Sequence, residues 1–212
     1  MQKKGETQSV NYIILRHSPF QESGLLLSGI SPERGRLDFI VRGAKSQGKK
    51  KFPVAGLFRE MRIEYRMDHE NSFPNLKSME LISCFDGISA HTSHYLSACT
   101  LAKFLLDNTR PMLDSSEIYT AFRLLLTRYA EGRELTERAV LLKTAFLSGN
   151  GMLPEPDNRN GEELLETLFS ASQGMAEPPR FSQEYWEKLD RRFDLLLRQN
   201  GFPLLEKMPF RV

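Results

Sequence analysis

Near Gly87 the spacing of the apolar residues changes, so this chain has to form two kinds of domain. Before that point, residues 57–66 alternate apolar and charged side chains, which is the period of a half-buried strand. After it, apolar residues between 88 and 108 recur at helical spacing. The sequence therefore predicts a β-rich domain over residues 1–85 and a helical domain over residues 86–212.

The β-rich part contains five short runs of strand-forming residues, separated by turn formers such as Ser-Pro and Glu-Ser-Gly. Five short strands in about 85 residues fit a small closed barrel, because closure removes exposed sheet edges. The predicted strands are residues 12–16, 25–30, 36–42, 57–66 and 76–85.

The second part reads as five helices, which makes the predicted fold class α+β. Pro111 ends the first helix, and Asp114 followed by Glu117 predicts the capped start of the second. Pro, Asn and Gly residues make the segment 149–161 an irregular connector. The predicted helices are residues 88–108, 114–132, 134–148, 162–171 and 182–200.

A cluster of basic residues is the main functional signal. Between Arg34 and Lys51, seven Lys and Arg residues accompany one acidic residue, Asp38. This concentration of charge is typical of a surface that binds phosphates. Among the aromatic residues of this part, which could stack on bases, we expect Phe52 to be exposed. The predicted DNA-binding residues are Arg34, Arg36, Arg42, Lys45, Lys49, Lys50, Lys51 and Phe52.

Residues 43–50 also nearly match a P-loop, which would indicate a nucleotide hydrolase. A P-loop needs Ser or Thr after its Lys to bind Mg²⁺, and a helix that points its N-terminus at the phosphates. Here Lys50 occupies the hydroxyl position, and Pro53 falls within the first turns of the required helix. The segment is better explained as a flexible basic hairpin loop that contacts phosphates through its charges, and the remaining alternative is an ordinary solvated loop.

The residues that a metal site or an active site needs do not occur as a set. Cys84 and Cys99 are the two cysteines of the chain, so a four-cysteine site is impossible. His91 and His94 lie three residues apart on a predicted helix, but no clear further ligand accompanies them. No Gly-x-Ser-x-Gly turn is present. We therefore expect no metal, no cofactor and no catalytic residues.

The helical part carries basic residues among its leucines, and they allow two interpretations. They could form the rim of an apolar groove for an acidic peptide with an aromatic end, or they could belong to solvated helix faces, which is the commoner case. The residues are Arg123, Arg128, Arg133, Arg138 and Lys143.

The sequence predicts neither a membrane span nor a signal peptide. Apolar runs do not exceed about four residues, and residues 1–11 are polar. We expect a protein of the cytoplasm.

Several motifs, in order along residues 12–82, resemble the bacterial recombination mediator RecO. Residues 15–25 (LRHSPFQESGL) are similar to the first strand of that family and the turn after it. Phe58, the strand 63–65 (IEY) and Leu81 continue the similarity, and residues 195–209 weakly resemble the closing helix and tail. The remaining matches are residues 35–37 (GRL) and 42–46 (RGAKS).

The resemblance implies an OB-fold β-barrel followed by a helical bundle. It also implies binding to single- and double-stranded DNA, annealing of complementary strands, and partnership with RecR and with the single-strand-binding protein. Together these activities would help load RecA onto DNA covered by the single-strand-binding protein, in the cytoplasm at the nucleoid. Members of the family are not enzymes.

One departure from the family lies in the connector. Many relatives carry a four-cysteine zinc module there, where this chain has only the short segment 153–161 without cysteine. The alternative interpretation of the whole chain is a protein-interaction adaptor whose barrel binds no nucleic acid.

Overall fold

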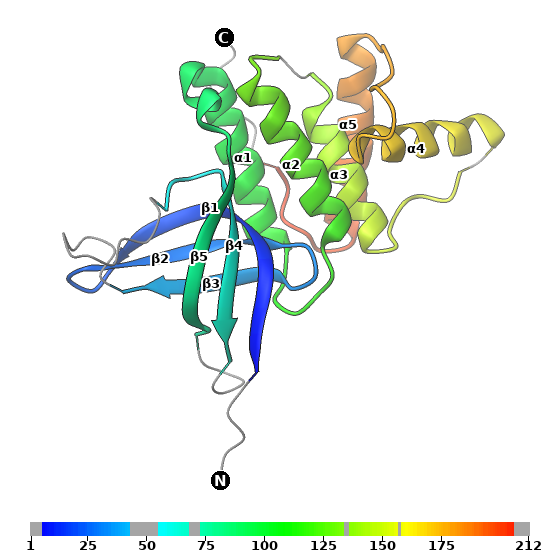
Figure 1. Cartoon of the computed structure of the whole chain (residues 1–212). Coiled ribbons are helices and arrows are strands. Elements are labelled where there is room, and N and C mark those ends of the chain that lie inside the picture. Colours follow the sequence, from blue (N-terminus) through cyan, green and yellow to red (C-terminus); the bar gives the residue numbers. More distant parts are fainter. Residues whose placement is uncertain (1–5, 43–54, 68–72, 134–135, 157, 206–212) are drawn as a thin grey trace. The chain divides into compact units, whose positions relative to one another are not determined.

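The computed structural model describes residues 6–42, 55–67, 73–133, 136–156 and 158–205 (Figure 1). Within these residues, β-strands come first and helices follow, as the α+β prediction requires. The strands are β1 (Thr7–Phe20), β2 (Gly24–Ser31), β3 (Gly35–Val41), β4 (Arg59–Arg66) and β5 (Asn75–Cys84). The helices are the 3-10 helix η1 (Asp86–Ala90) and the α-helices α1 (Thr92–Asn108), α2 (Ser116–Ala130), α3 (Arg138–Gly149), α4 (Arg159–Ser172) and α5 (Gln183–Gln199).

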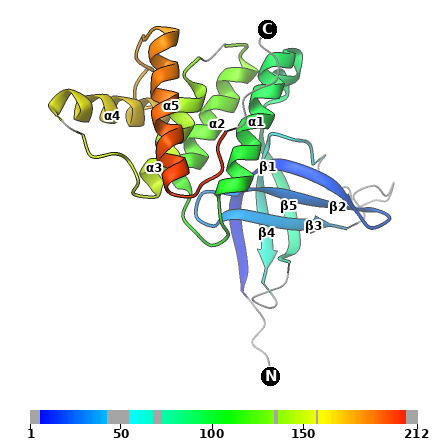
Figure 2. The same ribbon diagram turned by 180° about the vertical axis from the view of Figure 1, so that it is seen from behind.

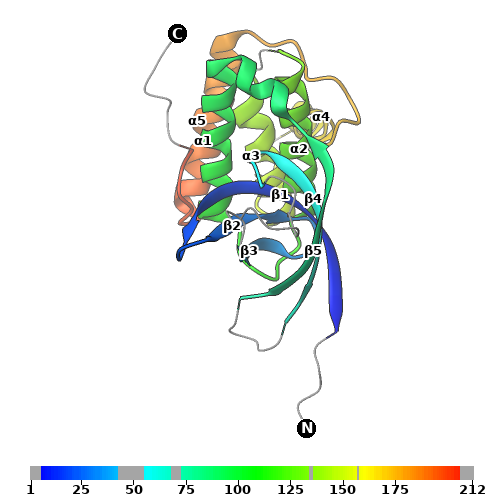
Figure 3. The ribbon, with the colours of Figure 1, turned by 60° about the vertical axis from the view of Figure 1, so that its left-hand side comes forward.

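The five strands form one antiparallel sheet in the order β3-β2-β1-β4-β5. Its middle strand, β1, is long because it has two partners: its first half pairs with β4 and its second half with β2. The exchange of partners coincides with a bulge at Leu15, which bends the strand (Figure 3). The two outer strands, β3 and β5, approach each other. This is the OB-fold, a partly open five-stranded barrel, and it confirms the predicted fold class.

Tyr12 lies at the centre of the barrel core. Its ring contacts Phe39 edge-on at 5.2 Å between centroids, and Phe39 contacts Tyr65 in the same way at 5.4 Å. The Tyr12 hydroxyl donates a hydrogen bond of 3.0 Å to the carbonyl of Leu37 on β3. A side chain at Gly29 would collide with the Tyr12 ring at 2.5 Å, so β2 needs glycine where it passes this ring.

The segment Thr109–Asp114 belongs to the barrel unit, although it connects α1 and α2. The backbone N–H of Arg36 donates to the carbonyl of Arg110 (3.2 Å), and the N–H of Met112 donates to the carbonyl of Arg34 (2.9 Å). The prediction from sequence assigns this segment to the helical domain. In space, the barrel unit is instead assembled from two pieces of chain, residues 1–85 and 109–114.

The helical unit comprises residues 86–108 and 115–212, and α3 is its central helix. This helix contacts α2, α4 and α5 (Figure 2), and every residue from Val140 to Leu147 is buried. The predicted cap at Asp114 is wrong, because α2 has Ser115 as its N-cap residue and Asp114 belongs to the barrel unit. None of the helices that the structure describes is both long and apolar enough to cross a membrane.

Candidate nucleic-acid interface

The outward sides of β1, β2 and β3 carry a group of exposed and half-buried residues, which we call the β1–β3 face. Leu27, Phe39 and Val41 point into the core, so the residues that alternate with them point outward. The strand register sets Arg16 beside Ser28 and Asp38, and Ser18 beside Leu26 and Ile40. Arg36 and Arg42 extend the β3 edge of the face. Its members are Arg16, Ser18, Leu26, Arg36, Asp38, Ile40 and Arg42, while Ser28, opposite Arg16, is buried.

The β1–β3 face has an apolar middle between two exposed arginines. Ser18, Leu26 and Ile40 are half-buried and share one row across the three strands. Arg16 and Arg42 are exposed on either side of this row. The Arg16 guanidinium lies 3.4 Å from the Ser28 hydroxyl. The arrangement suits a strand of nucleic acid, whose phosphates need cations and whose bases need an apolar surface.

The predicted basic residues that the structure describes, Arg34, Arg36 and Arg42, are spread along β3. Arg42 immediately follows β3, whereas Arg34 lies in the turn before it. They are eight positions apart, and the extended chain between them spans roughly 25 Å. Arg36, between the two, forms an ion pair of 3.5 Å with Asp38, so its charge is partly neutralised. Of the described candidates, Arg42 is the exposed cation at the predicted site.

Arg34 lies near Tyr65, at the end of β3 opposite to Arg42. Burial raises the pKa of the Tyr65 phenol, while the charge of Arg34 lowers that pKa and the charge of Glu33 raises it. The Tyr65 hydroxyl donates to the side chain of Gln8 on β1 (2.8 Å). Arg34 therefore lies close to the buried phenol of β4.

Five of the predicted residues lie outside the described part of the chain: Lys45, Lys49, Lys50, Lys51 and Phe52. Arg16, in contrast, belongs to the face but not to the predicted set. No other Lys or Arg lies within ten residues of it in the sequence, and its position opposite Ser28 depends on the bulge at Leu15. The aromatic residues Tyr12, Phe39, Phe58 and Tyr65 are all buried, and Phe20, at the end of β1, is half-buried.

His91, just before α1, and His94, on α1, bring two rings together without a third described ligand. The rings of His91 and His94 lie 4.9 Å apart, and His94 is buried and stacked on Tyr129. In the described ranges no group of three His, Cys, Asp or Glu side chains could hold a metal ion.

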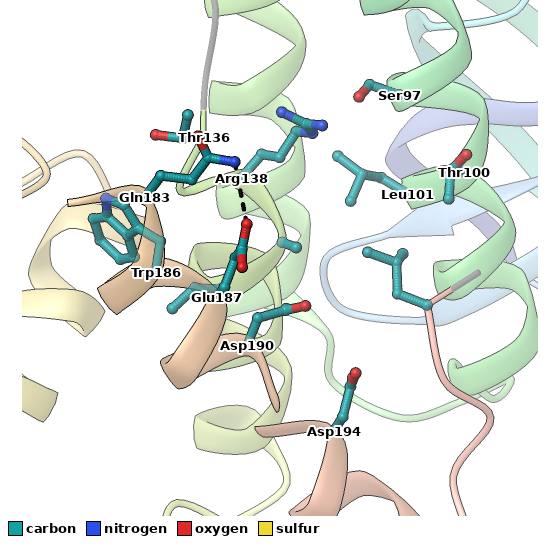
Figure 4. A pocket seen from close by; sticks show the side chains of 13 residues that line it. Ser97, Thr100, Leu101, Thr136, Arg138, Gln183, Trp186, Glu187, Asp190 and Asp194 are labelled. Carbon is teal, nitrogen blue, oxygen red and sulfur yellow. Dashed lines mark hydrogen bonds between the residues drawn. The ribbon is translucent and has the colours of Figure 1, made fainter. Parts of the chain in front are cut away.

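The helical unit contains a pocket between α1, α3 and α5 (Figure 4). Trp186 and Leu101 supply apolar walls, and Gln183 donates a hydrogen bond of 3.1 Å to Glu187 at the edge. Asp190 and Asp194 also line the pocket. This wall is acidic, whereas Arg138, one of the basic residues singled out in the sequence, also lines the pocket. Arg128 and Arg133, two more of that set, line a second groove together with Phe181 and Trp186.

Lys143, in contrast, does not belong to the rim of a groove. It is buried, and its ammonium lies 2.5 Å from a carboxylate oxygen of both Asp190 and Asp194. Of the other residues of the predicted rim, Arg128 is buried, Arg138 is half-buried, and Arg123 and Arg133 are exposed.

Comparison with known proteins concerns the barrel. A family model described as recombination protein O N terminal matches residues 7–85. The match begins with the first residue of β1 and ends one residue after β5, so it includes all five strands. No curated protein matches the chain.

Proposed function

We propose that this chain, whose residues 7–85 match the N-terminal domain of recombination protein O, is a member of the RecO family and a DNA repair and recombination mediator. It binds single- and double-stranded DNA without sequence specificity and anneals complementary strands. With RecR, it helps load RecA onto DNA coated by the single-strand-binding protein, in the cytoplasm at the nucleoid. It supplies binding surfaces and no catalytic group. The match of residues 7–85 to the family model is the observation that carries this proposal.

The β1–β3 face supports the DNA-binding part of the proposal. Arg16 and Arg42 would contact phosphates, and the half-buried side chains of Leu26 and Ile40 would contact bases. Neither contact depends on which base is present, so binding would not be sequence-specific. The lysines at 45 and 49–51 follow Arg42 in sequence and would extend the contact with the backbone.

A titration against labelled single-stranded DNA at several salt concentrations tests this function. Each phosphate contact should contribute about −0.7 to the slope of log affinity against log salt. With about four to six contacts, we expect a slope of roughly −3 to −4. No binding, or an affinity that does not change with salt, would favour the adaptor interpretation instead.

Two arginine variants locate the contact. Arg42→Ala should lower the affinity and make the salt slope shallower by about 0.7. Arg62→Ala is the matched control, because Arg62 is exposed on β4, opposite Glu80 and away from the β1–β3 face. Equal losses in the two variants would show that the contact is not on the β1–β3 face.

A further inference from the structure

The connection between α1 and α2 presents two large apolar side chains to solvent. Met112 is 63% exposed and Leu113 is 52% exposed. Both belong to the segment Thr109–Asp114 of the barrel unit, and we call this pair the 112–113 tip. Large apolar side chains that sit together on a surface often mark a place of interaction.

The position of the tip on the barrel is fixed by the backbone. Hydrogen bonds between Arg36 and Arg110 and between Met112 and Arg34 attach the segment to the start of β3 (Figure 1). Pro111 forms a bridge with Gly35 between these two bonds, and its ring restricts the backbone further. The segment thus extends the edge of β3 and holds Met112 in a defined place.

Met112 adopts a backbone conformation that costs free energy. Its φ is +65°, in the left-handed region that glycine adopts without strain. For a side chain such as methionine this conformation costs roughly 1–2 kcal/mol. A strained residue persists where the surrounding structure imposes it, and such residues concentrate at ligand sites. Here the conformation accompanies the hydrogen bond from the Met112 N–H to Arg34, and it leaves the apolar side chain exposed to water.

The charges beside the tip are balanced. Among the residues that flank the tip in its own segment and in the turn before β3, Arg34 and Arg110 are matched in number by Glu33 and Asp114. The tip is therefore suited to the uncharged part of a ligand. It also lies at one end of β3, the strand whose other end leads to Arg42 on the β1–β3 face.

We propose that the 112–113 tip is a wedge that packs against an unpaired or terminal base, at a junction between single-stranded and duplex DNA. This inference rests on the proposed function, because it takes the β1–β3 face as the site of the single strand. Methionine, leucine and proline are side chains that other DNA-binding proteins insert between base steps. If single-stranded DNA runs along β3, the wedge would contact the duplex at the point where this DNA strand separates from its complement.

The test uses the full chain and a variant with Met112→Gly and Leu113→Ser. Glycine relieves the strained φ, so this variant should fold with an unchanged or higher melting temperature. The ligand is a junction of duplex and single-stranded DNA with 2-aminopurine as the base at the junction. We expect the unaltered protein to change the 2-aminopurine fluorescence, and the variant to leave the fluorescence unchanged. The affinity for the junction should fall about 5- to 50-fold, as when a side chain that stacks on a base is removed.

The salt dependence separates this role from a phosphate contact. The variant lacks apolar side chains only, so its salt slope should equal that of the unaltered protein. Leu195→Ser, which removes a leucine that is 56% exposed on α5, is the matched control and should leave the affinity unchanged.

Failure of the wedge can be distinguished from failure of the proposed function. If the unaltered protein binds junction DNA and the tip variant binds it equally well, the wedge is wrong while DNA binding stands. The tip would then be a contact for a protein partner. If the unaltered protein binds no DNA, both proposals are wrong.

Discussion

Tyr12 connects three strands of the barrel through one side chain. It belongs to β1, its ring lies against Gly29 on β2, and its hydroxyl donates to Leu37 on β3. Because the side chain is fully buried, its phenol must stay neutral. Burial raises the pKa of Tyr12 well above the usual value of 10.0, and the nearby charge of Asp38 raises it further, while that of Arg36 lowers it.

This shift makes the stability of the barrel sensitive to alkaline pH. The unfolded chain ionises Tyr12 near pH 10.0, whereas the folded barrel does so only at a higher pH. The contribution is therefore complete below about pH 10 and disappears as the pH rises towards the folded-state value. Between about pH 9.5 and 11, urea unfolding of Tyr12→Phe should depend less on pH than that of the unaltered protein. The difference should be up to about 1.4 kcal/mol per pH unit.

At neutral pH the same variant should be less stable by about 1–3 kcal/mol, since it leaves the Leu37 carbonyl without its partner hydroxyl. Tyr185→Phe, at an exposed position on α5, is the control. Identical pH profiles for Tyr12→Phe and the unaltered protein would contradict the prediction.

At this scale the sequence predicts which residues are basic but not where they lie. Arg34 and Arg42 are eight positions apart in the sequence, so a count of charges along the chain places both in one basic cluster. The intervening strand is extended, however, and carries them to opposite ends of the barrel. Arg16 joins the face through pairing with β2, and that register depends on a bulge that no local pattern indicates.

Among the elements, α3 and α5 are joined by a buried ionic group. Lys143 on α3 is 2% exposed, and it bonds Asp190 and Asp194, one turn apart on α5. Removing the lysine leaves two carboxylates facing a cavity without a cation. We expect Lys143→Ala to lower the free energy of unfolding by about 3 kcal/mol, measured by urea denaturation.

A triple variant shows whether charge or packing holds these helices together. Lys143→Met with Asp190→Asn and Asp194→Asn removes all three charges and should recover most of the stability, because well-packed apolar groups can replace a buried ion pair. Lys103→Ala, in an exposed pair with Asp107, should cost less than about 0.5 kcal/mol. A loss at Lys143 as small as that at Lys103 would show that the buried pair contributes little.

The lysines after β3 give a prediction about the segment that follows it. Replacing Lys49, Lys50 and Lys51 together with alanine should weaken DNA binding and annealing. The salt slope should become shallower by about 0.7 for each phosphate that these lysines neutralise. Thermal stability should change by no more than about 0.5 kcal/mol per substitution, as is usual for surface residues.

Calorimetry with MgATP complements this experiment, and we expect no heat of binding. Heat in the unaltered protein that is absent from the triple variant would support the nucleotide-binding interpretation. An unchanged DNA affinity in the triple variant would indicate that Arg16 and Arg42, and not the three lysines, make the contact with DNA.

The periodicity of apolar residues predicts whether a segment is a strand or a helix. Where that strand or helix begins and ends depends on the segment that it pairs with or packs against. The sequence predicts the first strand over residues 12–16, because only that run is strongly β-prone. In the structure β1 spans Thr7–Phe20, since β4 pairs with its polar beginning and β2 with its end. Asp114 resembles a helix cap because capping is read from local sequence. Its segment instead pairs with the barrel, an interaction between residues far apart in the chain.

For the molecule as a whole, we expect folding without zinc. The connector after α3 contains no cysteine, and Asn158 caps α4 by accepting a hydrogen bond from the N–H of Gly161. The melting temperature should therefore be the same with and without a chelator, and elemental analysis should find no stoichiometric zinc. One zinc per chain, removed together with stability by the chelator, would contradict this and direct attention to His91 and His94.

Because β1 pairs with both β2 and β4, we expect the strands of the barrel to pair in a defined order during folding. Thr7 pairs with Arg66 at one end of the strand, whereas the ladder between β1 and β2 extends only from Ile13 with Ile30 to Phe20 with Gly24. The pairing of β1 with β4 closes a longer loop than the pairing of β1 with β2, and closing a longer loop costs more chain entropy. Contacts between residues distant in sequence also slow folding. The β1–β2 and β2–β3 ladders should thus form early and barrel closure by β4 late. Substitutions in the β1–β4 ladder would then change the unfolding rate more than the folding rate.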